Sequence, residues 1–197
     1  MGQITVYDTT PRGFAIHGED DLAIAQILAH RGLLSAPSRL PFPADIDLIC
    51  YDFDGVMTDN TLILDETGKE AVAVNRGDGL AVAAIRALGI PQVILSTETN
   101  PVVRTRAAKL GIDVFHGLAD KAASLHALVT EKQFSLDRVV YVGNDTNDLG
   151  PMQLVRYPIA PSNAHPSIIA IACHVTRAPG GRGVIRELYD AIFVRTT

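Results

Sequence analysis

The stretch YDFDGVMTDN, residues 51–60, places Asp52 and Asp54 close together directly after the apolar run IDLIC. Residues i and i+2 of an extended segment point the same way, so both carboxylates could converge on one reacting group. Two neighbouring carboxylates resist being charged together unless a cation lies between them or one of them holds a proton. Mg²⁺ could hold one as an ionised nucleophile while the other serves as general acid or base.

Two other interpretations of this stretch compete with catalysis. An EF-hand calcium loop starting at Asp52 needs glycine at its sixth position and glutamate at its twelfth, where the sequence has Met57 and Ile63. The calcium loop is therefore excluded. A solvated turn stays open, because Asp and Gly are common in turns, and the stretch alone does not decide between a turn and a catalytic pair.

Further polar residues follow other segments of the chain. Ser96 and Thr97 end the run VILST and can donate hydroxyl hydrogen bonds to an anion, while Lys121 lies early in a predicted helix. The run VVYV leads into GNDTND, which contains Asn144, Asp145 and Asp148. Phosphoryl transfer needs a nucleophile, a proton carrier, a cation and donors for the phosphoryl oxygens. Together these residues supply all four.

The elements that must position these residues follow from hydrophobic periodicity. From about residue 46 onward, short runs rich in Val, Ile and Leu alternate with helical patterns, which predicts an α/β fold with a doubly wound, Rossmann-like parallel sheet. Ligands bind at the carboxyl ends of the strands in such sheets, so the polar residues should meet there. The predicted strands are 46–51, 92–96, 113–115, 138–143 and 157–160, and the predicted helices are 78–89, 101–111 and 119–132.

Residues 61–75 have a different pattern. Two alternating runs surround the turn sequence DETG, which predicts a β-hairpin. The hairpin interrupts the first crossover right after the acidic stretch, so we expect it to act as a flap beside the site.

The N-terminal part reads as a separate piece, which divides the chain into an arm, 1–44, and a domain, 45–197. The arm contains GEDDLAIAQILAHRG, an amphipathic helical pattern with acids at its start and His, Arg and Gly at its end, followed by a proline-rich linker.

Composition excludes several function classes. The chain of 197 residues is 47% hydrophobic and 20% charged, enough to bury a core, and its net charge of −5 without a basic cluster argues against nucleic acid or an anionic membrane as partner. It has no apolar run long enough to span a bilayer and no signal peptide pattern. We therefore expect a cytoplasmic protein in which Cys50 and Cys173 are buried free thiols.

The four polar elements resemble those of the haloacid dehalogenase-like (HAD) superfamily of phosphotransferases, over residues 46–193. DFDGVMTDN resembles its first motif, Ser96 the second, Lys121 the third and GNDTND the fourth. The resemblance implies that Asp52 forms an aspartyl-phosphate and that Asp54 protonates the leaving alcohol and then activates water. It implies that Ser96 and Lys121 bind the phosphoryl group.

The resemblance also implies an Mg²⁺ ion held by Asp52, the Asp54 carbonyl and an acid of the fourth motif. That motif often reads Gly-Asp-Asp, whereas Asn144 stands at its first acidic position here. The metal assignment is open between Asp145 and Asp148. We favour Asp145, with Asp148 supporting the metal or Lys121.

Only the hairpin fits between the first motif and the next helix, so no large cap domain is expected. NRGDGLAVAAIRALGI and VTRAPGGRGVIREL resemble the cap-less branch that dephosphorylates eight- and nine-carbon keto-acid sugars. That branch includes 3-deoxy-octulosonate 8-phosphate and nonulosonate 9-phosphate phosphatases. The resemblance implies a sugar acid phosphate as substrate, and of the two sizes a nine-carbon one is favoured. It also implies a homotetramer in which a neighbouring subunit completes the site.

The substrate carboxylate needs a cation. Arg76 is the leading candidate, and Arg182 and Arg177 are weaker ones. Members of the branch carry a glycine-rich C-terminal tail that can reach an adjacent active site, and APGGRG, residues 178–183, fits such a tail.

GFAIHGEDDLAIAQILAHRG resembles the closing strand and helix of acylneuraminate cytidylyltransferases, some of which carry a fused phosphatase-like domain. This implies that the chain is part of a fused synthetase, with a cytidylyltransferase as a fused or partner domain, or a relative that kept a remnant. The leading hypothesis is a Mg²⁺-dependent sugar acid phosphatase in nonulosonate (sialic acid) biosynthesis. The alternative is an oligomerisation module of a cytidylyltransferase with weak or vestigial phosphatase activity.

Overall fold

The computed structural model describes residues 46–193. The chain divides into two units, Met1–Pro41 and Phe42–Thr197, and everything described below belongs to the second. The predicted N-terminal arm and its resemblance to a cytidylyltransferase lie outside the described residues.

A six-stranded parallel sheet forms the centre of the domain, in the order β5-β4-β1-β6-β7-β8. β1 is central and pairs with β4 on one side and with β6 on the other, so that Cys50 lies opposite both Val93 and Tyr141. The five predicted strands are confirmed, and a sixth, β8, was not predicted. The strands are β1 Leu48–Tyr51, β4 Gln92–Leu95, β5 Asp113–Phe115, β6 Val139–Val142, β7 Tyr157–Ala160 and β8 His174–Val175.

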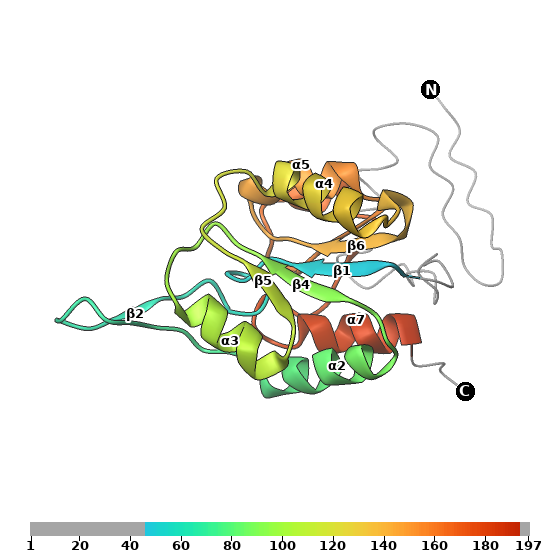
Figure 1. Ribbon diagram of the computed structural model, residues 1–197. Coiled ribbons are helices and arrows are strands. Elements are labelled where there is room, and N and C mark those ends of the chain that lie inside the picture. The colour runs from blue at the N-terminus through green and yellow to red at the C-terminus, as the bar shows by residue number, and fades with distance from the viewer. Residues whose placement is uncertain (1–45, 194–197) are drawn as a thin grey trace, which may run out of the picture. The chain divides into compact units, whose positions relative to one another are not determined.

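Helices cover both faces of the sheet (Figure 1). In β1, Ile49 and Tyr51 belong to one buried cluster, whereas Leu48 and Cys50 belong to the other. This alternation explains the continuous apolar run, since a strand covered on both faces buries every side chain. One cluster packs on α2 Arg76–Ala87, α3 Val102–Leu110 and α7 Val184–Phe193; the other packs on α4 Lys121–Lys132, α5 Leu149–Leu154 and α6 Pro166–Ile171.

The helix ends are set by local chemistry. The Asn75 side chain caps α2 by accepting from the N–H groups of Gly77 and Asp78, and Asp120 caps α4 by accepting from Ala123. α3 ends at Gly111, which adopts the left-handed conformation with φ of 67°. The α4 cap matters for the site, because it places Lys121 in the first position of the helix.

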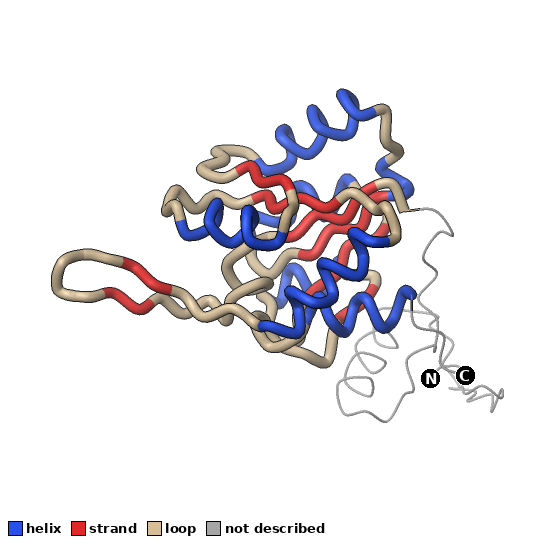
Figure 2. Tube along the Cα trace, turned by 60° about the horizontal axis from the view of Figure 1, so that its bottom comes forward, coloured by secondary structure: helices blue, strands red, loops and turns tan. Residues whose placement is uncertain are grey.

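The predicted hairpin is present and projects from the domain, as Figures 1 and 2 show. Its strands are β2 Ile63–Leu64 and β3 Glu70–Ala71, which pair antiparallel. No helix lies between β1 and α2, so the expected absence of a large cap is confirmed in the described chain.

Two expectations are corrected by the structure. Both cysteines are free, but only Cys50 is buried; Cys173 is exposed because it precedes the edge strand β8. APGGRG is an internal connection rather than a C-terminal tail, and its glycines pack within the same chain. It connects β8 to α7 and packs on the chain's own loop after β1, where the N–H of Gly181 donates to Val56 O at 2.9 Å.

None of the helices in residues 46–193 is long and apolar enough to cross a membrane.

Candidate active site

Asp52 directly follows the central strand and is buried at its carboxyl end. Its backbone N–H continues the sheet ladder by donating to Val142 O at 2.8 Å, which fixes where the side chain starts. Its Oδ1 accepts from the backbone N–H of Phe53 at 2.7 Å and lies 2.7 Å from Lys121 Nζ. The carboxylate is therefore held in one orientation by the sheet and by a cation.

Lys121 lies between two buried acids. Its Nζ is 2.7 Å from Asp52 Oδ1 and 2.8 Å from Asp148 Oδ1, and only 2% of the lysine is exposed. Asp148 is fully buried and also accepts from the Tyr141 hydroxyl at 2.9 Å and from the backbone N–H of Asn144 at 2.9 Å. With this many donors, Asp148 orients Lys121 and the loop after β6.

The buried charges shift one another's pKa values. Burial, together with the charge of Asp148, raises the pKa of Asp52, while Lys121 and the N–H of Phe53 act in the opposite direction. Burial alone would lower the pKa of Lys121, but the charges of Asp52 and Asp148 and their hydrogen bonds outweigh it, so that its pKa is raised. Lys121 is thus a permanent cation. A further cation beside Asp52 would favour the ionised form of the Asp52 carboxyl group.

Asp54 lies two residues further along the loop and is half-buried. Its Oδ1 accepts from the hydroxyl of Thr58 at 3.2 Å. Burial raises the pKa of Asp54, with the Thr58 hydrogen bond opposing the shift. A carboxyl group whose pKa is raised toward neutrality is suited to give and take protons.

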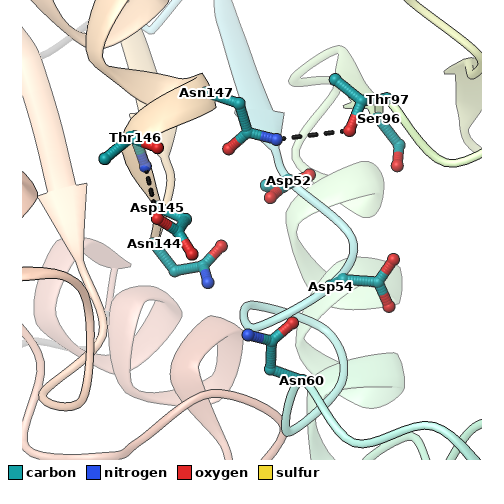
Figure 3. A pocket seen from close by; sticks show the side chains of 9 residues that line it. All are labelled: Asp52, Asp54, Asn60, Ser96, Thr97, Asn144, Asp145, Thr146 and Asn147. Carbon is teal, nitrogen blue, oxygen red and sulfur yellow. Dashed lines mark hydrogen bonds between the residues drawn. The ribbon is translucent and has the colours of Figure 1, made fainter.

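A pocket of about 370 Å³ opens over these acids at the carboxyl ends of β1, β4 and β6 (Figure 3). No cationic side chain lines it in the described chain. The positive charge available to an anion is therefore that of Lys121, which lies buried behind Asp52. The lining residues are Asp52, Asp54, Asn60, Ser96, Thr97, Asn144, Asp145, Thr146 and Asn147.

The side-chain amide of Asn144 lies against both acids. One of its two terminal atoms is 3.1 Å from Asp52 Oδ2 and 2.7 Å from the carbonyl oxygen of Asp54. With the nitrogen on this side the amide donates to both oxygens. With the oxygen on this side, which is the amide orientation drawn in Figure 3, the Asn144 oxygen meets Asp52 Oδ2 and the Asp54 carbonyl oxygen. Three converging oxygens are the kind of ligands that Mg²⁺ prefers, so the residues fit a bound divalent cation.

The two acids of the fourth motif lie in different places, because Asp148 is buried beside Lys121 whereas Asp145 is exposed. Asp145 lines the pocket, and its Oδ1 accepts from the N–H of Thr146 at 2.7 Å. Within residues 46–193, no group of three or more His, Cys, Asp and Glu side chains is arranged to hold a metal ion. A cation here would therefore depend on the amide of Asn144 and the carbonyl of Asp54 as well as on a carboxylate.

The arginines expected to bind a substrate carboxylate do not line the pocket. Arg76 is exposed at the start of α2. Arg182 pairs with Asp59 at 3.2 Å, and Arg177 is almost fully exposed, with Glu187 3.6 Å away. Within one chain, the expected carboxylate-binding cation is therefore not brought to the acids.

Several residues of the site have no signal in the sequence pattern. Asn60, Thr146 and Asn147 line the pocket, and Asn147 Nδ2 donates to Thr97 Oγ1 at 3.3 Å across it. The hydroxyl of Thr58 donates to Asp54, and the hydroxyl of Tyr141 donates to Asp148. Their positions inside the first motif and inside β6 could have marked Thr58 and Tyr141 as neighbours of the acids, but not as their hydrogen-bond donors.

The sequence of this chain is similar to those of known hydrolases. A family model described as haloacid dehalogenase-like hydrolase matches residues 93–188. The 3-deoxy-D-manno-octulosonate 8-phosphate phosphatase of Yersinia pestis is 34% identical over 152 residues, which cover 77% of this chain and 81% of the relative.

Solved structures agree. A HAD family hydrolase from Streptomyces avermitilis is 46% identical with a TM-score of 0.77, covering 80% of this chain and 90% of that one. A 3-deoxy-D-manno-octulosonate 8-phosphate phosphatase from Moraxella catarrhalis, solved with magnesium, phosphate and KDO, is 29% identical with a TM-score of 0.71; 74% of this chain and 84% of that one are covered.

Proposed function

Because this chain belongs to the cap-less branch of the haloacid dehalogenase-like hydrolases and is a phosphoric monoester hydrolase, we propose that it dephosphorylates a 2-keto-3-deoxy sugar acid through an aspartyl-phosphate. The observation that carries the proposal is the position of Asp52. Its carboxylate lies at the floor of a pocket, with a buried lysine 2.7 Å away and a second carboxyl group two residues on.

In the proposed reaction, the carboxylate of Asp52 attacks phosphorus and the bond from phosphorus to the sugar oxygen breaks. Asp54 gives its proton to that oxygen, so the sugar leaves as an alcohol. Asp54 then takes a proton from water as the water attacks the aspartyl-phosphate, which releases phosphate and restores Asp52. Lys121 and the Ser96 hydroxyl donate to the phosphoryl oxygens, where negative charge gathers.

The proposed cation is Mg²⁺, which the Moraxella catarrhalis relative contains. When bound, it neutralises charge on the phosphoryl oxygens. We propose Asp52, the Asp54 carbonyl and Asn144 as its protein ligands. Asn144 replaces Asp145 of the sequence-based expectation because its amide lies within 3.1 Å of both other ligands.

The substrate class rests on the relatives. By their names, the Yersinia pestis and Moraxella catarrhalis relatives act on an eight-carbon sugar acid phosphate, which supports 3-deoxy-octulosonate 8-phosphate beside the nonulosonate 9-phosphate favoured by the sequence. Both substrates carry a carboxylate. Since no cation lines the pocket in the described chain, we propose that an arginine of a neighbouring copy binds that carboxylate, with Arg76 and Arg182 as candidates.

We expect phosphate to be released from octulosonate 8-phosphate or nonulosonate 9-phosphate with Mg²⁺ present, and EDTA to abolish release, because the site fits a cation among its oxygens. The measurement is phosphate release across a panel of sugar phosphates, with glucose 6-phosphate as a substrate without a carboxylate. Activity restored by excess Mg²⁺ is the control for EDTA. The proposal is wrong if both sugar acid phosphates stay intact with Mg²⁺.

The hairpin favours assembly and supports a homotetramer. It exposes adjacent apolar side chains, with Ile63 62% and Leu64 61% exposed, which is typical of interaction surfaces. The same feature favours the second candidate, an oligomerisation module of a cytidylyltransferase. The two differ in rate: turnover well below ~1 per second on the best substrate would favour the module.

Ile63→Asp is expected to lower the oligomeric mass, because a charge would be buried in the proposed contact. Sedimentation velocity measures the mass of the wild type and the variant. Leu88→Asp, at an exposed apolar position after α2, is the matched control and should keep the wild-type mass. A monomeric wild type, or an unchanged mass for Ile63→Asp, contradicts the proposed assembly.

A further inference from the structure

The segment Gly180–Gly181, between β8 and α7, packs directly on the loop that carries Asp54. Gly180 is buried, and a Cβ atom built on it would collide with the carbonyl oxygen of Gly55. Gly181 has φ of +68°, and a Cβ there would lie 2.5 Å from the backbone nitrogen of Asp59. Its own N–H donates to Val56 O at 2.9 Å. The two backbones therefore touch over several residues, with no room for a side chain between them.

This loop holds Asp54 through one hydroxyl group. Thr58 is fully buried, and its Oγ1 accepts from the N–H of Gly55 at 3.2 Å and from that of Asn60 at 3.3 Å. A hydroxyl has a single proton to donate. With both N–H groups directed at the oxygen, the proton goes to Asp54 Oδ1, 3.2 Å away. Thr58 therefore sets the orientation of the Asp54 carboxyl group.

Side chains from other parts of the domain hold the glycine segment by hydrogen bonds to its backbone and to the residues before it. The side-chain oxygen of Asn163 accepts from the N–H of Gly180 at 2.9 Å. Glu187 of α7 accepts from the N–H groups of Arg177 and Ala178 at 2.9 and 2.8 Å. Asp78, buried in the first turn of α2, accepts from the N–H of Arg186 at 2.9 Å and so ties α7 to α2. These bonds make the segment a fixed surface rather than a free connection.

We propose that Gly180–Gly181 is a positioning element for Asp54, acting through the loop 55–59 and the hydroxyl of Thr58. The inference rests on the proposed role of Asp54 as proton carrier. The segment prevents the loop from moving away from the pocket, and so keeps the carboxyl group in line with the leaving oxygen. A misplacement of ~1 Å can lower the rate of an enzyme about 10²-fold. A loop displaced by a clash with the glycine segment would therefore be enough to slow the reaction.

Gly180→Ala tests this, because the φ of Gly180 lies outside the left-handed region and only the space for a methyl group is lacking. The measurement is kcat/KM for two substrates. The sugar phosphate has an alcohol leaving group that needs a proton, whereas p-nitrophenyl phosphate has a leaving group that departs without one. We expect Gly180→Ala to lower kcat/KM about 10- to 100-fold for the sugar phosphate and less than about 3-fold for p-nitrophenyl phosphate.

Three further variants make the test specific. Thr58→Val should show the same dependence on the leaving group, and Thr58→Ser, which keeps the hydroxyl, should restore activity toward the sugar phosphate. Gly89→Ala adds a methyl group that meets nothing within 4 Å, at a φ of +78° that strains a side chain, so it should lower stability without changing the ratio of the two substrates.

Equal losses on both substrates, or no loss in Gly180→Ala and Thr58→Val, would overturn the inference while leaving the proposed function intact. A wild type that releases phosphate from neither substrate would overturn the proposed function and the inference with it. Should Gly180→Ala not fold, the comparison of Thr58→Val with Thr58→Ser still tests whether the loop positions Asp54 through the Thr58 hydroxyl.

Discussion

Asp52→Asn is expected to lower phosphate release on the order of 10⁴-fold or more, because an amide oxygen is a poor nucleophile toward phosphorus. The substitution keeps the shape of the side chain, and Lys121 keeps its contact with Asp148 at 2.8 Å. The fold should therefore survive. The measurements are steady-state phosphate release and, after acid quenching, the amount of labelled phosphate bound to the protein.

Asp137→Asn is the matched control, since Asp137 lies in the 3₁₀ turn Leu136–Arg138, outside the pocket. It should retain wild-type turnover and the protein-bound label, whereas Asp52→Asn should lose both. Label that persists in Asp52→Asn would show that another group is the nucleophile.

Lys121→Met is expected to abolish turnover and to lower the free energy of unfolding by about 3–5 kcal/mol, because it leaves two buried carboxylates without their cation. Asp52 and Asp148 each lie within 2.8 Å of Lys121 Nζ in the wild type. Without Lys121, only the N–H of Phe53 opposes the effect of burial on Asp52, so the pKa of Asp52 should rise further. A carboxyl group whose pKa is raised by folding destabilises the fold above that pKa, so lowering the pH should narrow the difference in stability between variant and wild type as Asp52 takes up a proton. Urea unfolding at two pH values measures this.

Lys132→Met, in the last turn of the same helix, controls for the loss of one lysine from α4. Its side chain is 51% exposed and pairs at 3.4 Å with Glu131, whose side chain is also exposed, so stability and turnover should stay close to the wild type. Equal stabilities of Lys121→Met and Lys132→Met would mean that Lys121 does not compensate the buried acids.

The central acids were predictable because their positions depend on local patterns. Short Val- and Ile-rich runs marked the strands, and parallel strands bring their carboxyl ends to one edge. The sequence placed Asp52, Ser96 and Asp145 after three such runs, and the structure brings all three to the pocket. The absence of a large cap was equally predictable, since it follows from the short distance between β1 and α2.

Other expectations depend on packing, which the sequence does not show. Asp145 was favoured as a metal ligand by comparison with the fourth motif, and it lines the pocket; the structure also brings the amide of Asn144 within 3.1 Å of Asp52 Oδ2 and of the Asp54 carbonyl oxygen, so the choice between them stays a prediction. APGGRG was read correctly as a site of close backbone approach, but its partner is the chain's own loop after β1. Arg76 and Arg182 do not line the pocket in the described chain, so their role stays a prediction that requires a second copy.

The sequence by itself determined the fold class, the hairpin and the order of the polar residues at the strand ends, because periodicity and turn chemistry act over a few neighbouring residues. Only the tertiary structure decided which groups hold those residues in place. The Lys121–Asp52 pair, the Lys121–Asp148 pair and the contact of Gly180 with Gly55 join distant segments of the chain. Such contacts depend on how close two backbones come, and no local pattern encodes that distance.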